Sequence, residues 1–520
     1  MRYQPFFIII SQDITLKMTY ILRYQGFFLE YLKLYIIIYN MIGREKERNE
    51  LLKLYENKDP QFVAIYGRRR VGKTYLVTNT FEDKFTFRHS GLSPEECNNS
   101  DKTATRLQLD HFYNSLKLYG LEESKKPKTW LDAFFLLEKL LIQKDDGNKQ
   151  LVFIDELPWM DTPKSNFISA LEGFWNSWAC GRKNFMLIVC GSSNSWILNK
   201  LINNHGGLYG RLTYEIKLNP FCLSACESFL KSKNIIYSRF DIVQSYMVFG
   251  GIPYYLGYLS PALSLIQSVD DLFFSSKARL RNEFERLFKS VFKNPKNAET
   301  VVRLLSTKNK GFTRKEIVEK TDIKEGGAIT DVLSALIASD FIVTYTPFGE
   351  SKKNTYYKLI DPFCIFFLRF VEGKDSLNLD NMGLENLDTP KSNAWRGLAF
   401  ENVCFNHISE IKNALGIKNV ATRQTLLSPQ SEDAYNSQID LIIERRDNII
   451  NLCEMKFCSD DYTVSKEYYR RLLQRVNNIQ PLVNRKCAVR NTLITTFGLK
   501  KNEYSSAFSD VIVLDDLFSH

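Results

Sequence analysis

Three residue types in one short stretch, GRRRVGKT from Gly67 to Thr74, suit the binding of phosphate groups. The stretch follows the apolar run FVAIY and precedes YLV, so a strand–loop–helix is expected around it. It matches G-x-x-x-x-G-K-[ST], in which glycines let backbone N–H groups curl around phosphate oxygens. Lys73 can reach the terminal phosphates of ATP, and Thr74 can bind Mg²⁺. The residues expected to bind the nucleotide are Gly67, Arg68, Arg69, Arg70, Val71, Gly72, Lys73, Thr74 and Tyr75.

Two adjacent acids, Asp155 and Glu156, stand at the end of the apolar run LVFIDE. A strand that delivers an acid to the C-terminal edge of a parallel sheet places that acid beside the bound phosphates. We expect Asp155 to hold Mg²⁺ and Glu156 to polarise the attacking water as a general base. Ser192 and Ser193 follow a third apolar run, FMLIVCG. Either serine could hydrogen-bond the γ-phosphate or the attacking water, and a simple turn after the strand is the alternative.

Arg211 lies between a Gly-rich loop and an expected strand, within GGLYGRLTYEIKLNPF. An arginine in this place can stabilise the charge on the γ-phosphate, either in its own subunit or in a neighbouring one. We assign it to the catalytic set with Glu156. A surface salt bridge is the competing interpretation.

Six motifs in a fixed order resemble one known family. They are MIGREKERNELLKLY at 41–55, followed by GRRRVGKT, FIDELPWM, CGSS, LYGR and GGIPYYL. Over residues 41–275 the chain resembles the archaeal-type ATPase family of the AAA+/STAND P-loop superfamily. The resemblance implies an α/β fold, with a P-loop AAA+-type parallel sheet and a small helical lid at GGIPYYLGYL. The sequence has no G-x-G-x-x-G, so binding of a dinucleotide is not supported.

A second candidate site lies in NLCEMKF, residues 451–457, where two charges interrupt a mostly apolar run. In a strand, residues two apart point to the same face, so Glu454 and Lys456 should stand side by side. An ordinary ion pair at a sheet edge is the simplest explanation. With Glu401 and Asp440, however, the chain has the order E … D … E-x-K, which resembles the PD-(D/E)xK nuclease core found in this family's C-terminal domain.

This resemblance implies specific roles for the four residues. Asp440 and Glu454 would share one Mg²⁺, a hard cation that prefers oxygen ligands. Glu401 would bind the waters of the metal, and Lys456 would position water or stabilise negative charge, so that Glu454 and Lys456 are the catalytic pair. The following helix carries two residues where this fold often has a supporting side chain, Gln474 and Arg475.

The 520 residues are too many for one core, and roughly 150 residues per domain suggests about three domains. Three helices followed by an alternating hairpin, from about Ala298 to Asp361, indicate a winged helix. Its third helix has few basic residues, so packing or dimerisation is as reasonable a role as contact with DNA. The segment DPFCIFFLRFV is expected to pack the domains together. The expected parts are an uncertain extension at 1–40, the P-loop core at 41–220, a helical lid and linker at 221–290, a winged-helix domain at 291–372 and a restriction-endonuclease-like α/β domain at 373–520.

Composition places few further limits on function. The formal charge of +10 fits a nucleic-acid partner better than an acidic one. Ten cysteines without a CxxC pair indicate reduced thiols and a cytoplasmic protein. Charges interrupt the apolar first 40 residues, so no membrane segment is expected. Natural translation from Met18 or Met41 is one explanation of that region, and a marginal amphipathic surface helix is the other.

Together these features predict an Mg²⁺-dependent ATPase whose nucleotide state controls a metal-dependent nuclease-like domain acting on nucleic acid. DNA and further copies of the chain are the candidate partners. The alternative is an ATP-driven signalling switch, in which the C-terminal domain is a docking or DNA-binding module without catalysis. A transcription regulator built on the winged helix is a third interpretation.

Overall fold

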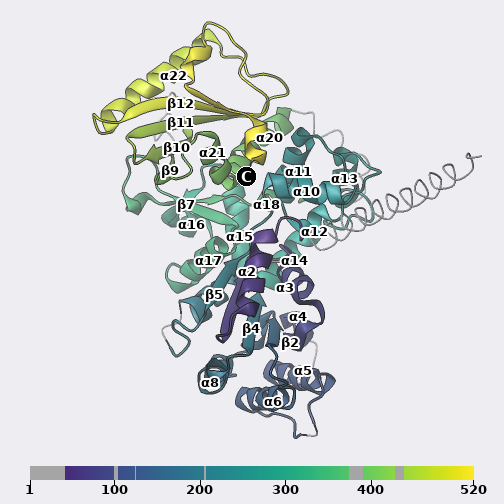
Figure 1. Ribbon diagram of the computed structural model, residues 1–520. Helices are drawn as coiled ribbons and strands as arrows, with labels where there is room; N and C mark the ends of the chain where they lie inside the picture. The colour runs from purple at the N-terminus through teal and green to yellow at the C-terminus, as the bar shows by residue number, and fades with distance from the viewer. Residues whose placement is uncertain are drawn as a thin grey trace, which may run out of the picture.

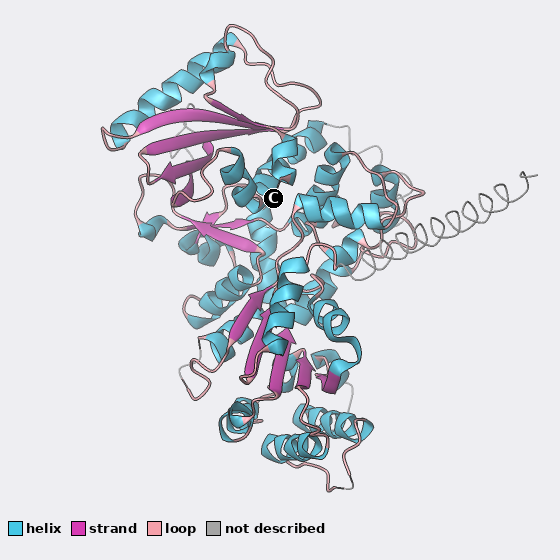
Figure 2. Cartoon of the chain, in the orientation of Figure 1, coloured by secondary structure: helices cyan, strands magenta, loops and turns pink. Residues whose placement is uncertain are grey.

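The computed structural model describes most of the chain, and the N-terminal extension predicted at 1–40 lies outside the described part. The described residues are 41–98, 103–122, 124–203, 206–373, 390–427 and 439–519. They form two five-stranded sheets and one three-stranded sheet, with helices around them (Figure 2). Among these residues, no helix has both the length and the apolar character needed to cross a membrane.

The first sheet is parallel throughout and has the strand order β2-β3-β4-β1-β5. Three of its strands are buried along their whole length, which explains why they appear in the sequence as continuous apolar runs. This sheet confirms the predicted α/β class. The strands are β1 (Gln61–Tyr66), β2 (Phe85–Ser90), β3 (Gln150–Asp155), β4 (Phe185–Gly191) and β5 (Tyr214–Lys217).

Helices cover both faces of this sheet (Figure 1). Alternate residues of β1 point to opposite faces, so Val63 and Ile65 join one core while Phe62 and Ala64 join the other. The helices of this part are α2 (Glu45–Glu56), α3 (Lys73–Phe81), α4 (Pro94–Asn98), α5 (Ala104–Leu118), α6 (Trp130–Gln143), α7 (Leu157–Met160), α8 (Phe167–Ser177) and α9 (Asn194–Ile197).

A group of helices, here called the lid, follows β5. Gly250 ends the second of these helices in the left-handed conformation, with φ of +68°. This turn directs the chain into the GGIPYYL segment, where Pro253 occupies the first helical position of the next helix. The lid helices are α10 (Leu223–Ser232), α11 (Arg239–Phe249), α12 (Pro253–Leu256), α13 (Leu265–Phe273) and α14 (Glu283–Val291).

The middle part, here called the wing module, has three helices followed by a β-hairpin, with a short strand between the first two helices. A capping box in which Thr313 and Glu316 bond each other's backbone N–H begins α16. The third helix buries Ile329, Val332, Leu333 and Leu336, whereas Ile337 is 38% exposed. The elements are α15 (Pro295–Ser306), β6 (Phe312–Thr313), α16 (Arg314–Lys320), α17 (Gly327–Ala338), β7 (Ile342–Tyr345) and β8 (Tyr356–Leu359), with strand order β6-β8-β7.

The segment DPFCIFFLRFV forms α18 (Pro362–Phe366) and a further helical turn, Phe367–Val371. Asp361 caps α18 by accepting the backbone N–H of Cys364 at 2.8 Å. The helix packs against α11 of the lid, and the ring of Phe363 stacks on that of Tyr255. As expected, the segment joins neighbouring parts of the molecule.

The last part is built on the second five-stranded sheet, of order β13-β12-β11-β10-β9. Its first three strands along the chain are antiparallel, and β11, β12 and β13 are parallel. The chain then returns to the centre of the molecule, where its C-terminal 3-10 helix η11 (Leu514–Phe518) packs against α10, α11 and α21 (Figure 1). The other elements are α20 (Pro390–Asn406), α21 (Ile408–Ala414), β9 (Thr422–Leu427), β10 (Ile439–Arg445), β11 (Ile449–Lys456), α22 (Lys466–Ile479), β12 (Ala488–Thr495) and β13 (Asp510–Ile512).

Candidate nucleotide site and candidate acidic site

The GRRRVGKT stretch forms a tight loop between β1 and α3, as its glycines require. Gly67 has φ of +149°, and a Cβ atom there would lie 2.2 Å from the carbonyl oxygen of Leu218. Gly72 also has positive φ, at +94°. Lys73 begins α3, and its Nζ donates to the carbonyl oxygens of Gly67 and Arg68 at 2.9 and 3.1 Å. The loop is therefore closed on itself, with its lysine at the N-terminus of a helix, where phosphate binds well.

A cavity of about 770 Å³ opens in front of this loop. Its volume lies within the usual range for sites that hold small molecules, about 300–1,000 Å³. Both the P-loop region and the lid line this cavity. Arg69 to Tyr75 belong to the loop and the start of α3, and Phe229, Ser232 and Tyr254 belong to the lid. Nucleotide in this cavity would touch both the P-loop and the lid.

Thr74 and Asp155 lie side by side, as predicted from the two motifs. The hydroxyl of Thr74 donates to Oδ2 of Asp155 at 2.7 Å. Oδ1 of Asp155 accepts the backbone N–H of Glu156 at 2.9 Å and the thiol of Cys190 at 2.6 Å. A hydroxyl beside a carboxylate at a P-loop is an oxygen donor pair suited to Mg²⁺, so the two residues present fit that ion.

Glu156 also lines the cavity, in the left-handed conformation with φ of +45°. Its Oε2 accepts both the backbone N–H and the hydroxyl of Ser192, each at 3.0 Å. Burial raises the pKa of Glu156, and Lys73 opposes this shift. A carboxylate with a raised pKa that faces the nucleotide cavity is suited to accepting a proton from water. Ser192 thus binds Glu156 in this arrangement, and its contact with the γ-phosphate stays a prediction.

Asn194 is a site residue that the sequence interpretation missed. Its Oδ1 accepts the backbone N–H of Gly67 at 2.8 Å, and its Nδ2 donates to the carbonyl oxygen of Ala338 at 2.9 Å. The side chain is fully buried. Asn194 therefore connects the first residue of the P-loop to the end of α17 in the wing module. Its position two residues after CGS was the only available signal in the sequence.

The three arginines of the loop have different surroundings. Arg69 and Arg70 line the cavity, as predicted, but the Arg68 side chain does not. Arg68 is 2% exposed, and its Nη1 forms an ion pair with Oδ2 of Asp361 at 2.7 Å. Arg70 pairs with Glu283 of the lid and lies over the ring of Tyr254 at 4.2 Å. The carboxylate of Asp361 thus holds the guanidinium of Arg68 away from the cavity, and binding of nucleotide by the backbone of Arg68 stays a prediction.

Arg211 is exposed and does not line the cavity. Its backbone N–H donates to the carbonyl oxygen of Leu208 in a turn before β5. The arrangement does not bring its side chain to a nucleotide in the same chain. The remaining part of the prediction is a contribution to the site of a neighbouring subunit.

The predicted acidic residues of the C-terminal part lie on three elements, α20, β10 and β11. Register pairs Leu441 with Cys453 in antiparallel β10 and β11, so Asp440 and Glu454 are neighbours across the two strands. Oδ2 of Asp440 accepts the backbone N–H of Met455 at 3.1 Å. Glu454 is 4% exposed, as a charged residue in a buried strand. Glu401 reaches the same region from α20, since its charge acts on Glu454 and Asp440.

Two cations hold Glu454. Its Oε1 lies 2.5 Å from Nζ of Lys456, and its Oε2 lies 2.5 Å from Nη1 of Arg475 on α22. Burial alone would raise the pKa of Glu454, but Lys456 and Arg475 outweigh it and lower that pKa. Burial, followed by the charges of Glu454 and Glu401, raises the pKa of Asp440 to about 7. The predicted same-face pair Glu454 and Lys456 thus exists as an ion pair in which Glu454 is buried and the Lys456 side chain is 34% exposed.

Glu401 is bound by two residues of the wing module that the sequence interpretation missed. Asn309 donates to its Oε2 at 3.0 Å, and Nζ of Lys358 lies 3.8 Å from the same oxygen. Within the described ranges, no three acidic, histidine or cysteine side chains are arranged to hold a metal ion. In this arrangement one oxygen of Glu401, one oxygen of Asp440 and both oxygens of Glu454 already have partners within the chain, and metal binding by these three carboxylates stays a prediction.

Comparison with known families bears on the first site. Residues 41–259 match a family model described as an ATPase domain predominantly from Archaea. The match includes the P-loop, Asp155, Glu156 and the first lid helices. The expected ATPase activity is confirmed for this part of the chain. The matched range ends before the wing module and the acidic site.

Comparison with single proteins gives more distant matches. The chain is 26% identical over 384 residues to Uncharacterized protein MJECL04 of Methanocaldococcus jannaschii. The aligned region covers 71% of this chain and 77% of that protein. The Walker-type ATPase PABY2304 of Pyrococcus abyssi matches with 18% identity and a TM-score of 0.46, over 64% of this chain and 99% of its own. The ORC2 protein of Aeropyrum pernix, in ADPNP-ADP complexes, matches with 12% identity and a TM-score of 0.38, over 62% and 92%.

Proposed function

We propose that this chain is an Mg²⁺-dependent ATPase whose nucleotide state controls a C-terminal nuclease-like domain that acts on nucleic acid. The observation that carries the proposal is the direct seating of the C-terminal part on the lid. The lid borders the nucleotide cavity, so any adjustment of the lid to nucleotide reaches the acidic site through packed side chains.

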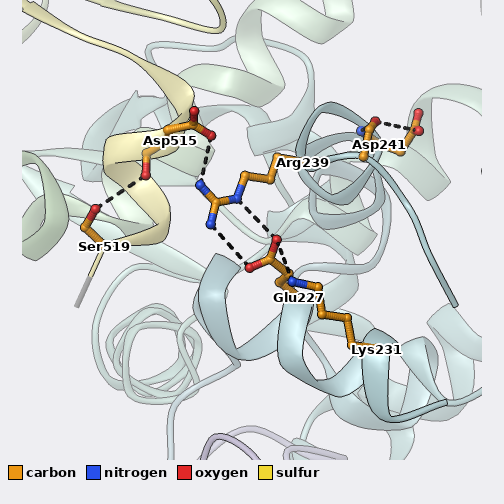
Figure 3. A network of polar contacts seen from close by, with 7 residues as sticks. Glu227, Lys231, Arg239, Asp241, Asp515 and Ser519 are labelled. Atoms are coloured by element: carbon orange, nitrogen blue, oxygen red, sulfur yellow. Dashed lines mark hydrogen bonds and ion pairs between the residues drawn. The ribbon is translucent and has the colours of Figure 1, made fainter. Parts of the chain in front are cut away.

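A polar network joins the lid to the C-terminal end of the chain (Figure 3). Arg239 of α11 pairs with Glu227 of α10 at 3.2 Å and with Asp515 of η11 at 2.9 Å. The same guanidinium lies over the ring of Phe518 at 4.6 Å. Exposed ion pairs contribute little stability each, so we assign this network to orientation rather than to strength.

Buried contacts supply the strength of the same junction. The backbone N–H of Leu223, at the start of α10, donates to Nε2 of His407 at 3.0 Å. The ring of Tyr246 lies against that of His407, with centroids 5.1 Å apart. Both His407 and Tyr246 are nearly or fully buried. The lid and the C-terminal part therefore share one core, which favours their movement as a unit.

In the proposed ATPase reaction, the chain's own residues bind, orient and accept a proton. Lys73 and the P-loop amides hold the phosphates, and Thr74 and Asp155 would hold Mg²⁺, which supplies charge neutralisation on the phosphate oxygens. Glu156, positioned by Ser192, takes a proton from the attacking water. Arg211 of a neighbouring copy is the candidate for a further charge at the γ-phosphate.

The decisive experiment measures cleavage of DNA and RNA by the full chain, with and without ATP, in the presence of Mg²⁺ or Mn²⁺. Cleavage that changes with ATP, and that is lost in both Lys73→Ala and Asp440→Asn, supports the proposal. Cleavage that persists in Asp440→Asn comes from another source. Absence of cleavage in every condition would remove the nuclease part and leave the ATPase.

One observation favours a second candidate, an ATP-driven signalling switch with a non-catalytic C-terminal docking module. Every carboxylate of the acidic site is bound by a partner within the chain: Met455 for Asp440, Lys456 and Arg475 for Glu454, and Lys358 with Asn309 for Glu401. Under this alternative the charges only stabilise the fold. ATP-dependent assembly of copies without cleavage would distinguish it, and sedimentation with ATP and with ADP would measure it.

A further inference from the structure

Lys358 is a buried cation whose place in the molecule neither site explains. It lies on β8 of the wing module and is 3% exposed. A buried ammonium is costly unless it is paired, and the carboxylate of Glu401 on α20 is the partner, with Nζ to Oε2 at 3.8 Å. The ammonium also lies over the ring of Phe405 at 4.9 Å. The charge of Asp440 acts on it as well.

The wing module therefore supplies both polar partners of a carboxylate that belongs to another part of the chain. Asn309, before β6, donates to the same Oε2 of Glu401 at 3.0 Å. The ammonium of Lys358 brings positive charge to the carboxylate of Glu401, as a divalent cation bound there would.

Three residues after Lys358, the same segment is bound to the P-loop. Oδ2 of Asp361 pairs with Nη1 of Arg68 at 2.7 Å, and these side chains are 3% and 2% exposed. The two residues between Lys358 and Asp361 are buried as well, and the backbone N–H of Ile360 and of Asp361 both donate to the carbonyl oxygen of Phe341. The segment is thus packed along its length, with one end at each site.

We propose that Lys358 is a built-in cation that closes the acidic site, and that segment 358–361 connects this closure to the P-loop through Asp361 and Arg68. The inference rests on the acidic site of the proposed function and adds how that site is regulated. The ammonium of Lys358 and a divalent cation compete for the carboxylate of Glu401. Binding of the divalent cation displaces Lys358, and loosening of the Arg68–Asp361 pair favours that displacement.

The test is binding of Mn²⁺ to the full chain without nucleotide, followed by the signal of free Mn²⁺ in electron paramagnetic resonance. Asp440→Asn defines the part of the binding that belongs to the acidic site. We expect Lys358→Met, which keeps the length of the side chain, to bind Mn²⁺ at this site about tenfold more tightly or better. Lys358→Arg retains the positive charge and should bind as the wild type does.

The outcomes separate this inference from the function on which it rests. Equal affinities in the wild type and Lys358→Met would overturn the closure by Lys358 and leave the acidic site standing. Absence of any Asp440-dependent binding in both proteins would overturn the acidic site itself. A wild-type measurement covers the case in which Lys358→Met does not fold: saturating Mn²⁺ should increase the chemical acetylation of Lys358, and unchanged acetylation contradicts the displacement.

A separate set of Mn²⁺-binding measurements tests the connection between segment 358–361 and the P-loop. Arg68→Met lies in the loop and touches none of the acidic side chains, yet we expect it to tighten Asp440-dependent Mn²⁺ binding severalfold. Arg69→Met, at the adjacent position, lines the nucleotide cavity and does not contact Asp361, so it is the matched control and should have no effect. Arg68→Lys should restore wild-type affinity. Identical affinities in Arg68→Met and Arg69→Met would overturn the connection.

Discussion

The ring of Phe457 stacks on the ring of Phe240, with centroids 5.0 Å apart and 18° between their planes. Phe457 directly follows Lys456, and Phe240 lies on α11 of the lid. Helix α11 packs on α10, whose Phe229 and Ser232 line the nucleotide cavity. Two consecutive contacts therefore lead from the wall of the nucleotide cavity to the end of the strand that carries Glu454.

Replacement of Phe240 by alanine should weaken this connection without changing the nucleotide site. Phe240 does not line the cavity, so the affinity for ATP should stay within about twofold of the wild type, less than 0.5 kcal/mol. The difference in hydrogen exchange of β11 between ATP-bound and free protein should become smaller. Phe240→Leu retains an apolar side chain at the contact and should keep more of that difference. An unchanged difference in Phe240→Ala would show that the stacked rings do not transmit the nucleotide state.

Lys73→Ala should abolish binding and turnover of ATP. The ammonium is the positive group at the start of α3, and charged hydrogen bonds to phosphate are worth about 1.5–3 kcal/mol each, so affinity should fall by at least about tenfold. Calorimetric titration with ATP and Mg²⁺ measures this. Lys53→Ala, which removes an exposed lysine of α2 outside the cavity, should bind normally. Wild-type affinity in Lys73→Ala would mean that ATP binds elsewhere.

Glu156→Gln should bind ATP normally and hydrolyse it slowly. Glutamine keeps the shape of the side chain and can still accept hydrogen bonds from Ser192, but it cannot take a proton from water. General-base catalysis contributes about 10²–10⁴-fold, so kcat should fall by that order while KM changes little. Steady-state release of phosphate measures both constants. Glu215→Gln on exposed β5 is the control, and normal turnover by Glu156→Gln would exclude Glu156 as the base.

Local chemistry made the nucleotide site predictable. The P-loop, Asp155 and Glu156 each adjoin a strand with a continuous apolar run, and parallel strands bring their C-terminal ends to one edge of the sheet. Asp440 and Glu454 were predictable for the related reason that they lie on neighbouring strands. In both cases the positions follow from the strand in which the residue lies.

Contacts between distant parts of the chain were not predictable in this way. Arg68 was assigned to the nucleotide because it lies within the loop, yet its partner Asp361 is in a different part of the fold. Lys358 is in an alternating strand whose sequence gives no sign that its ammonium would be buried beside Glu401. The hydrogen bond between His407 and the backbone of Leu223 was not predictable for the same reason. Which side chain meets which across a domain junction depends on packing that no local pattern records.

His407 has a protonation state that its contacts fix. Its Nδ1 lies 2.7 Å from the carbonyl oxygen of Val403, so that nitrogen donates, and its Nε2 accepts the N–H of Leu223 at 3.0 Å. A second proton would turn Nε2 into a donor that faces another donor. Burial lowers the pKa of His407 from 6.5 to about 4, with the bond to Val403 opposing the shift.

Acid should therefore loosen the lid from the C-terminal part. Because the pKa of His407 is lower in the folded state, the unfolded chain binds more protons between pH 6.5 and about 4, and stability falls as pH falls through that window. A difference of this size corresponds to a loss of about 2 kcal/mol in the free energy of unfolding between pH 7 and pH 5.

The amide of Leu223 reports the junction directly, so its hydrogen exchange, corrected for the intrinsic effect of pH, should lose protection at pH 5. His407→Gln can still accept this N–H and does not titrate, so its protection should change less over the same range. His89, whose pKa burial lowers to about 3, titrates in both proteins and cancels in the comparison. Equal losses of protection in the wild type and His407→Gln would show that His407 does not govern the junction.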